Sequence, residues 1–254
     1  KIGDAVRFME QGDNVLVSPY GPVYQEYDIQ ITKGGVIAGL GGQWTVVNPS
    51  TNTTPLAESF DYTYLPEIQP GSTNANSMFR VDCSGGESGQ LSVSGFRLRH
   101  GVANQTPGWG GAIYADSKSS SLCISHLYFD DNRATELGGA VFSRYMSDIS
   151  FDTCVFKNNL CEYDDGGNAC FTKGMGGAIA SICSTMTITN CILEQNAARV
   201  VKAGGNPTSG SAGGGGDIYN YFCTLKLIMS VSKGAKAGYA KEALPLTPSD
   251  SKTY

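Results

Sequence analysis

Two pairs of adjacent carboxylates are the residues of this sequence best suited to chemistry. They are Asp130/Asp131 and Asp164/Asp165, and paired carboxylates can act as general acid and base on a glycosidic bond or hold Ca²⁺. The first pair fills the middle of a Phe-Asp-Asp-Asn turn, and the second lies in a Gly- and Asn-rich stretch between two cysteines. We expect both pairs to be solvated turns, and we therefore predict no catalytic residue and no metal site.

The histidines and arginines of the sequence do not indicate a catalytic site. His100 and His126 have no evident partner in the sequence, and we expect exposed strand residues at both positions. A polysaccharide-degrading enzyme would need basic side chains facing Asp130 or Asp131 in a groove, and the candidates are Arg97, Arg99, Arg133 and Arg144. We expect no such convergence, because lysines and arginines are scattered along the chain. The Gly-rich segment 202–216 lacks the Gly-Lys-Ser/Thr ending of a phosphate loop, so no cofactor is expected.

Composition excludes several classes of protein. The chain has 18 Lys and Arg residues and 23 Asp and Glu residues, so its net charge is 18 − 23 = −5. It contains no block of basic residues, and we therefore expect no nucleic-acid partner. No run of about 18 apolar residues is present, so we expect no membrane span in this chain. Glycine accounts for 33 of the 254 residues, about twice its usual share, which indicates many tight corners.

Cysteine usage points to an oxidising compartment. The eight cysteines form an even set without a C-x-x-C pair. Cys161 and Cys170 bracket a short polar segment, and we predict a disulfide between them. We expect Cys154 and Cys191 to be free, packed thiols, and we assign no pairing to the remaining four: Cys83, Cys123, Cys183 and Cys223.

Two Asn-x-Thr sequons support the same compartment. Asn52 and Asn104 each begin such a sequon in loop-like sequence, and we predict them as glycosylation sites, with chance occurrence as the alternative. The chain begins at Lys1 rather than Met, and we expect it to be processed or trimmed. Together these features predict a secreted or cell-surface protein.

Two short motifs recur in phase along the chain. The first, Gly-Gly-Ala followed by Ile or Val, occupies 110–113, 138–141 and 176–179, with Asp217 in place of alanine in a fourth copy at 215–218. The second, an apolar residue and two spacers before asparagine, occurs at Phe129–Asn132, Phe156–Asn159 and Leu193–Asn196. Counting back two, five and seven residues from the apolar position aligns further apolar columns. The four columns are Leu98, Phe129, Phe156 and Leu193; Phe96, Leu127, Cys154 and Cys191; Val93, Ile124, Phe151 and Ile188; Leu91, Leu122, Ile149 and Met186.

This pattern predicts the fold. Alternation within each pair of columns indicates two short strands joined at a corner, and the Gly-Gly turn leads into a third. Such units, stacked in phase, form a single right-handed, three-sheet parallel β-helix, an all-β solenoid with variable Gly-rich loops. Asn132, Asn159 and Asn196 then share one column and can form an amide ladder beside Phe129, Phe156 and Leu193. A β-sandwich is the alternative, although it does not explain the in-phase columns.

At these motifs the chain resembles the repeats of chlamydial polymorphic outer membrane proteins and related surface β-helix proteins. The resemblance covers roughly residues 90–230 and departs from the pattern at Leu193 and Asp217. It implies a surface-exposed protein with a structural or adhesive role. It carries no catalytic residue over to this chain.

We interpret residues 1–254 as one domain. Residues 1–89 form the opening coils with a polar insertion near 49–77, 90–230 form the repeat coils, and 231–254 form a terminal segment or cap. An open end of a β-helix exposes strand edges. We therefore expect residues 1–11 and the tail 240–254 to cover the ends, or else other molecules to do so.

The function predicted from these observations is that of a non-catalytic extracellular surface protein with a structural or adhesive role. Self-assembly into a fibre or coat is one form of that role. Its expected partners are itself, other surface proteins or glycans. The alternatives are a carbohydrate-active β-helix enzyme, either a polysaccharide lyase or a glycoside hydrolase, and a non-catalytic glycan-binding module.

Overall fold

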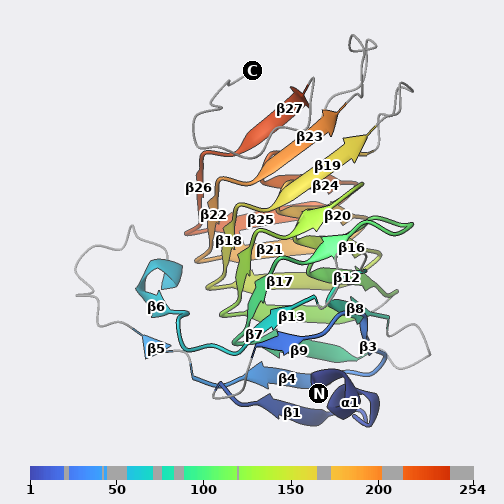
Figure 1. Ribbon diagram of the computed structural model, residues 1–254, viewed down its shortest axis with the longest axis vertical. Helices are drawn as coiled ribbons and strands as arrows, with labels where there is room; N and C mark the ends of the chain where they lie inside the picture. The colour runs from blue at the N-terminus through green and yellow to red at the C-terminus, as the bar shows by residue number, and fades with distance from the viewer. Residues whose placement is uncertain are drawn as a thin grey trace.

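The chain folds as a parallel β-helix whose coils stack from the N-terminus to the C-terminus (Figure 1). The computed structural model describes residues 1–19, 23–41, 43–44, 56–70, 76–82, 89–118, 120–164, 173–201 and 214–240. Within these residues four stacks of parallel strands run along the solenoid, and we number them sheets 1 to 4 in the order in which a complete coil visits them.

Each sheet takes one strand from successive coils. Sheet 1 contains β1 (Asp13–Val17), β4 (Gly35–Gly39), β9 (Gln90–Ser94), β13 (Ser121–Ser125), β17 (Asp148–Asp152), β21 (Thr185–Thr189) and β25 (Thr224–Ile228). Sheet 2 contains β2 (Tyr24–Gln25), β7 (Glu67–Gln69), β10 (Arg97–Arg99), β14 (Tyr128–Asp130), β18 (Val155–Lys157), β22 (Ile192–Glu194) and β26 (Val231–Lys233). Sheet 3 contains β11 (Val102–Ala103), β15 (Arg133–Ala134), β19 (Leu160–Asp164), β23 (Ala197–Val201) and β27 (Lys236–Ala240). Sheet 4 contains β3 (Ile29–Ile31), β8 (Phe79–Val81), β12 (Ile113–Asp116), β16 (Val141–Arg144), β20 (Ile179–Ile182) and β24 (Ile218–Tyr221).

The four predicted apolar columns form the core. Every member of the four columns is buried, with at most 2% of its surface exposed. Strand pairing places Phe129 opposite Phe156 and Phe156 opposite Leu193, as the spacing predicts. The rings of Phe129 and Phe156 stack with centroids 4.5 Å apart and planes 3° from parallel. The prediction of a parallel β-helix with these columns buried is confirmed.

The number of sheets differs from the prediction, since four parallel sheets are present and not three. Sheet 3 lies between the asparagine turn and the Gly-Gly turn, where the sequence pattern predicts no strand. Its strands β11 and β15 are only two residues long, and their inward residues are Ala103 and Ala134. Such small side chains are buried without producing the apolar alternation by which a strand is detected.

The Gly-Gly motif is explained by two separate constraints. Its first glycine, at Gly110 or Gly138, has φ near +60°, where an added Cβ would lie 2.1 Å from a carbonyl oxygen of the same turn. At its second glycine, there is no space for a side chain between the backbones of neighbouring coils. A Cβ at Gly139 would lie 2.0 Å from the carbonyl oxygen of Gly177.

A ladder of buried asparagine amides holds the turn between sheets 2 and 3. Asn132 Nδ2 donates to Asn159 Oδ1 (2.9 Å), and Asn159 Nδ2 donates to Asn196 Oδ1 (2.9 Å). Each amide also donates to the coil before it, as when Asn159 Nδ2 bonds the carbonyl oxygen of Phe129 (3.1 Å). All three asparagines are fully buried, so these bonds satisfy groups that water cannot reach.

Asp217 ends this ladder. The next coil has Ala235 where the pattern would place asparagine, and Asn196 Nδ2 donates instead to Asp217 Oδ1 (2.8 Å). The other oxygen of Asp217 accepts a bond from the Ser232 hydroxyl. Burial raises the pKa of the Asp217 carboxyl, and these two hydrogen bonds oppose the shift. The departure from Gly-Gly-Ala therefore supplies an acceptor that the last coil lacks.

A short helix covers the N-terminal end of the solenoid. Helix α1 (Ile2–Arg7) lies against the first coil and places Ile2 and Val6 in the main core (Figure 1). The Glu26 carboxylate accepts hydrogen bonds from the backbone N–H groups of Ile2 (2.7 Å) and Gly3 (2.8 Å). This end is covered by the expected segment, whereas residues 241–254 lie outside the described part of the chain.

A non-repeating segment crosses the outside of sheet 2, and we call residues 56–65 the strap. It contains the 3-10 helix η1 (Leu56–Ser59) and β6 (Phe60–Asp61), which pairs antiparallel with β5 (Gln43–Trp44). Its buried apolar side chains pack on an outward column of the solenoid; the participants are Ala57, Tyr62, Leu65, Tyr128, Val155, Ile192 and Val231. The predicted insertion at 49–77 is thus too long, because β7 within it is a regular strand of sheet 2.

The strap is bonded to several coils. The Tyr62 hydroxyl donates to the carbonyl oxygen of Thr153 (2.8 Å), and the Ala57 N–H donates to that of Asn190 (3.2 Å). Glu58 forms an ion pair with Lys233 (3.1 Å). Because these contacts lie on successive coils, the strap ties the solenoid together along its axis.

We expect Phe156→Ala to lower the free energy of unfolding by about 3–5 kcal/mol, because it removes a ring stacked in the core and leaves a cavity. The neighbouring Lys157→Ala is the control and should cost less than about 1 kcal/mol, because its side chain faces outward. Urea unfolding measures both variants. Equal losses would contradict the register described above.

Asp217 offers a paired test of the ladder's end. At neutral pH, Asp217→Ala should cost roughly 1–3 kcal/mol by leaving the buried Asn196 amide without its acceptor. Asp217→Asn keeps an acceptor and removes the buried charge, so it should be at least as stable as the unmodified chain.

The buried Asp217 carboxyl also predicts how the stability of the fold depends on pH. A carboxyl whose pKa is raised on folding stabilises the folded state most at low pH, and that contribution is lost as the pH rises through the folded-state pKa. Thermal unfolding between about pH 4 and 7 should therefore show a smaller loss of stability with rising pH in Asp217→Asn. Identical pH profiles would argue against a buried charge.

The strap can be tested with two tyrosines. Tyr62→Phe removes the buried hydroxyl bonded to Thr153 and should cost about 1 kcal/mol. Tyr64→Phe is the matched control, since Tyr64 is 60% exposed, and its effect should stay within about 0.5 kcal/mol. Chemical denaturation compares the two, and a Tyr62→Phe variant as stable as the control would mean that the strap is not fastened at this point.

Candidate functional site

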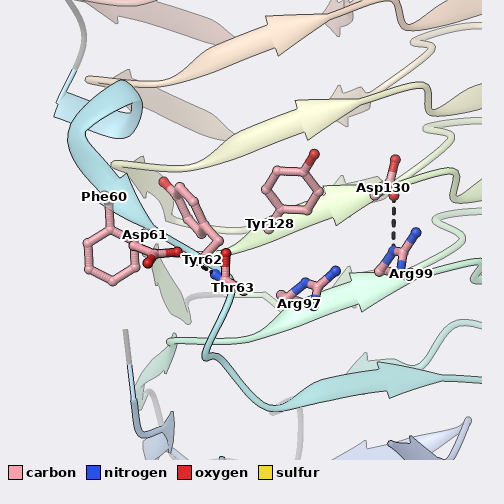
Figure 2. Close-up of a pocket in the computed structure, with 8 residues that line it drawn as sticks. All are labelled: Phe60, Asp61, Tyr62, Thr63, Arg97, Arg99, Tyr128 and Asp130. Atoms are coloured by element: carbon pink, nitrogen blue, oxygen red, sulfur yellow. Dashed lines mark hydrogen bonds and ion pairs between the residues drawn. The ribbon is translucent and has the colours of Figure 1, made fainter. Parts of the chain in front are cut away.

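A pocket opens where the strap crosses the early coils of sheet 2. Phe60, Asp61, Tyr62 and Thr63 of the strap form one side, and residues of β10 and β14 form the other (Figure 2). Its volume is about 430 Å³, within the usual range of roughly 300–1,000 Å³ for small-molecule sites. The pocket is therefore large enough to hold a small molecule.

Alternation along β10 places two arginines on the same outer face. Arg97 and Arg99 lie side by side at the base of the pocket, with Asp130 of β14 above Arg99 (Figure 2). Arg99 Nε lies 3.0 Å from Asp130 Oδ2. Glu67 Oε2, on β7, lies 3.1 Å from Arg97 Nη1 and 3.5 Å from Arg99 Nη1. Our expectation that acidic and basic side chains would not converge is therefore wrong.

The convergence follows from the stacking of the coils. β7, β10 and β14 are neighbours in sheet 2, and Arg97 pairs in register with Glu67 on one side and Tyr128 on the other. Opposite charges directly across adjacent strands attract each other. Residues scattered over the sequence thus meet because the coils place them one strand apart.

The same face continues as an alternating row of charges. Register places four charged residues in line, namely Arg99, Asp130, Lys157 and Glu194. The Lys157 and Glu194 side chains form an ion pair at 3.4 Å. This second pair does not line the pocket, so it provides a reference for the role of Asp130.

Aromatic rings line the side of the pocket nearest the strap. The rings of Tyr62 and Tyr128 have centroids 5.5 Å apart, and those of Phe60 and Tyr62 are 4.8 Å apart. Phe60 also packs on the His126 ring at 4.7 Å. Burial raises the pKa of the Tyr62 and Tyr128 hydroxyls, so both remain neutral phenols at ordinary pH.

Both histidines lie at corners and not in strands, and of the two only His100 is exposed as we expected. His126 is half-buried at the corner between β13 and β14 with φ of 55°, and burial lowers its pKa. His100 is at the corner after β10 with φ of 57°, and its Nδ1 lies 3.1 Å from Asp131 Oδ2. The His126 ring therefore packs at its corner, whereas the His100 ring pairs with Asp131 at the surface.

The two predicted carboxylate pairs do not act as pairs. Asp130 points into the pocket, whereas Asp131 has φ of 50° at the next corner and pairs with Arg133 (3.3 Å) and His100. Arg144, the fourth arginine considered, pairs with Asp116 of sheet 4. Asp164 ends β19 with an exposed side chain, and Asp165 lies outside the described residues.

The cysteines play structural parts in the described coils. Cys154 and Cys191 are free and fully buried in one column, where the Cys154 N–H lies 3.3 Å from Cys191 Sγ. Cys161 is a free, buried thiol that points inward beside Ala134 and Ala198, a core position that gives no support to a bridge. Cys170 lies outside the described residues, so the Cys161–Cys170 bridge stays a prediction.

Of the two predicted glycosylation sites, the structure describes one. Asn104 is exposed, as a glycosylation site requires, and Asn52 lies outside the described part of the chain. Within the described residues no group of three His, Cys, Asp or Glu side chains is placed to hold a metal ion.

Several residues of the pocket were missed by the sequence analysis. Phe60 and Tyr62 lie in the segment that we interpreted as a polar insertion, although its Phe-Asp-Tyr-Thr-Tyr run is rich in aromatic residues. Glu67 had no partner in the sequence. The alternation of Arg97 and Arg99 was the one signal available, because it places both guanidinium groups on one face of a strand.

Comparison with known proteins gives one short match. The model of the Chlamydia polymorphic membrane protein repeat matches residues 126–144, which contain the Phe129–Asn132 turn and the Gly138–Val141 motif. No curated protein and no solved structure matches the chain. In the described part of the chain, no helix has the length and apolar character needed to cross a membrane. The chain thus contains a repeat similar to that of these membrane proteins, which points to a surface or outer-membrane protein.

Proposed function

We propose that this chain is a non-catalytic surface protein with a structural or adhesive role. The matched repeat supports a location at the cell surface. The continuous core, the asparagine ladder and the strap support a stiff rod, because each of them joins successive coils. A rod of this kind can present its outer face to other molecules without changing its own shape.

The proposal that the protein is non-catalytic rests on the ion pairs formed at the pocket. Glu67 holds Arg97 and Arg99, and Asp130 holds Arg99. A glycosidase needs one carboxyl group as proton donor and a second facing the sugar from the other side. Glu67 and Asp130 lie on the same sheet and are engaged by arginines, which suits positioning better than proton transfer. Asp61 faces them from the strap, but hydrogen bonds from Thr63 lower the pKa of its carboxyl, which makes it a poor proton donor.

The same convergence also favours a second candidate function. A carbohydrate-active enzyme or a glycan-binding module would likewise gather acidic, basic and aromatic side chains in one pocket. Self-assembly into a fibre has less support at the N-terminal end, because α1 packs against the end of the core there. An adhesive role through the outer face is therefore our preferred form of the proposal.

Adhesion and turnover can be measured on the same preparation. We expect beads coated with the folded chain to adhere to cultured epithelial cells more strongly than beads coated with the heat-unfolded chain. We expect no rise in reducing ends or unsaturated sugars on incubation with pectate, alginate or xylan. Depolymerisation that disappears in Asp130→Asn would replace this proposal with an enzyme, and equal adhesion of folded and unfolded coats would remove the adhesive role.

A further inference from the structure

The pocket between the strap and sheet 2 has the composition of a site for a neutral, hydroxyl-rich ligand. Its lining contains two arginines, Arg97 and Arg99, and two carboxylates, Asp61 and Asp130. Glu67 does not line the pocket, but it forms ion pairs with both arginines. An anionic ligand would therefore meet as many carboxylates as arginines, and both arginines are already paired with a carboxylate. A cation would find two of the carboxylates already engaged by the arginines. Neither sign of ligand charge is favoured.

The polar atoms are arranged to offer both donors and acceptors. Arg97 and Arg99 are 26% and 27% exposed, whereas Glu67 and Asp130 are 11% and 14% exposed. The arginines thus turn part of their N–H groups towards the opening, while Glu67 and Asp130 hold the guanidinium groups in place. A guanidinium group has five N–H donors, so ion pairing leaves some of them for a ligand.

The strap supplies the remaining acceptors and the apolar surface. Asp61 Oδ1 accepts the Thr63 N–H (2.8 Å), which fixes this carboxylate at the rim opposite the arginines. Half-buried Phe60 and Tyr128 line the pocket beside these polar groups. Hydroxyl groups act as donors and acceptors at once, and the C–H face of a sugar ring packs on an aromatic side chain.

We propose that this pocket binds a neutral saccharide, with roughly one or two sugar rings held between the strap and strands β10 and β14. Arg97 and Arg99 donate to sugar hydroxyls, Asp130 and Asp61 accept from them, and Tyr128 packs on a ring face. The inference deepens the adhesive role proposed above and rests on it. It names the chemistry of the surface to which the rod would adhere.

Binding can be measured on the 254-residue chain by saturation-transfer NMR and titration calorimetry. The neutral probes are N-acetyllactosamine, cellotriose and mannotriose, and the anionic probes are sialyllactose and trigalacturonate. We expect at least one neutral probe to bind. Asp130→Asn should weaken that binding by about tenfold or more, because a charged acceptor is lost.

Glu194→Gln is the matched control for Asp130→Asn. Each variant removes one carboxylate of an ion pair on the outer face of sheet 2, but Glu194 and its partner Lys157 do not line the pocket. The control should change the affinity by less than about twofold. Thermal unfolding of both variants shows whether the loss of an ion pair has altered the fold.

A second variant changes the strap instead of sheet 2. Thr63 is an exposed strap residue that lines the pocket, and Thr63→Trp should block it and abolish binding. Tyr64→Trp changes the next residue, which does not line the pocket, and should leave binding intact.

Three outcomes would overturn the inference. They are binding of none of the neutral probes, equal losses in Asp130→Asn and Glu194→Gln, and unchanged binding in Thr63→Trp. The bead assay separates this inference from the adhesive role. If coated beads adhere to cells and Asp130→Asn leaves their adhesion unchanged, the adhesive role stands and the saccharide site falls.

Discussion

The in-register stacking of parallel strands is the constraint on which the whole structure depends. Each coil must fit its neighbour at one backbone spacing of about 4.8 Å. At the second glycine of each Gly-Gly motif the coils approach so closely that a Cβ at Gly177 would lie 2.0 Å from the carbonyl oxygen of Gly216. The same spacing brings like side chains into contact, so that Phe129 stacks on Phe156 and Asn132 bonds Asn159. The repeat in the sequence follows from this repeat in space.

A ladder built in this way has to end, and its end requires a different residue. A buried amide that has lost its next neighbour leaves an N–H group unsatisfied, which costs free energy. Asp217 meets the need by accepting from Asn196, at the cost of burying a carboxyl group. At the other end, the backbone N–H groups of α1 are bonded by Glu26. Both devices break the repeat where the repeat itself cannot complete its own bonds.

The candidate site arises where a non-repeating segment meets the repeat. Sheet 2 by itself presents an outward column of apolar side chains and a row of alternating charges. The strap covers part of that column and leaves a pocket beside Arg97, Arg99 and Asp130 (Figure 2). The solenoid thus supplies rigid positions, and the strap supplies a wall. The proposed adhesive surface depends on both, because neither part encloses a pocket alone.

The sequence by itself determined the parallel β-helix, its buried columns and the asparagine turn, because alternation and in-phase spacing are local properties that stacking only repeats. Sheet 3 escaped detection, since small inward residues such as Ala103 and Ala134 are buried without an apolar pattern. The pocket depended on the tertiary structure. Tyr62 and Tyr128 are 66 positions apart in the sequence, and only the stacking of β7, β10 and β14 decides that Glu67, Arg99 and Asp130 meet. Contacts between residues far apart in the chain have no local pattern from which they can be predicted.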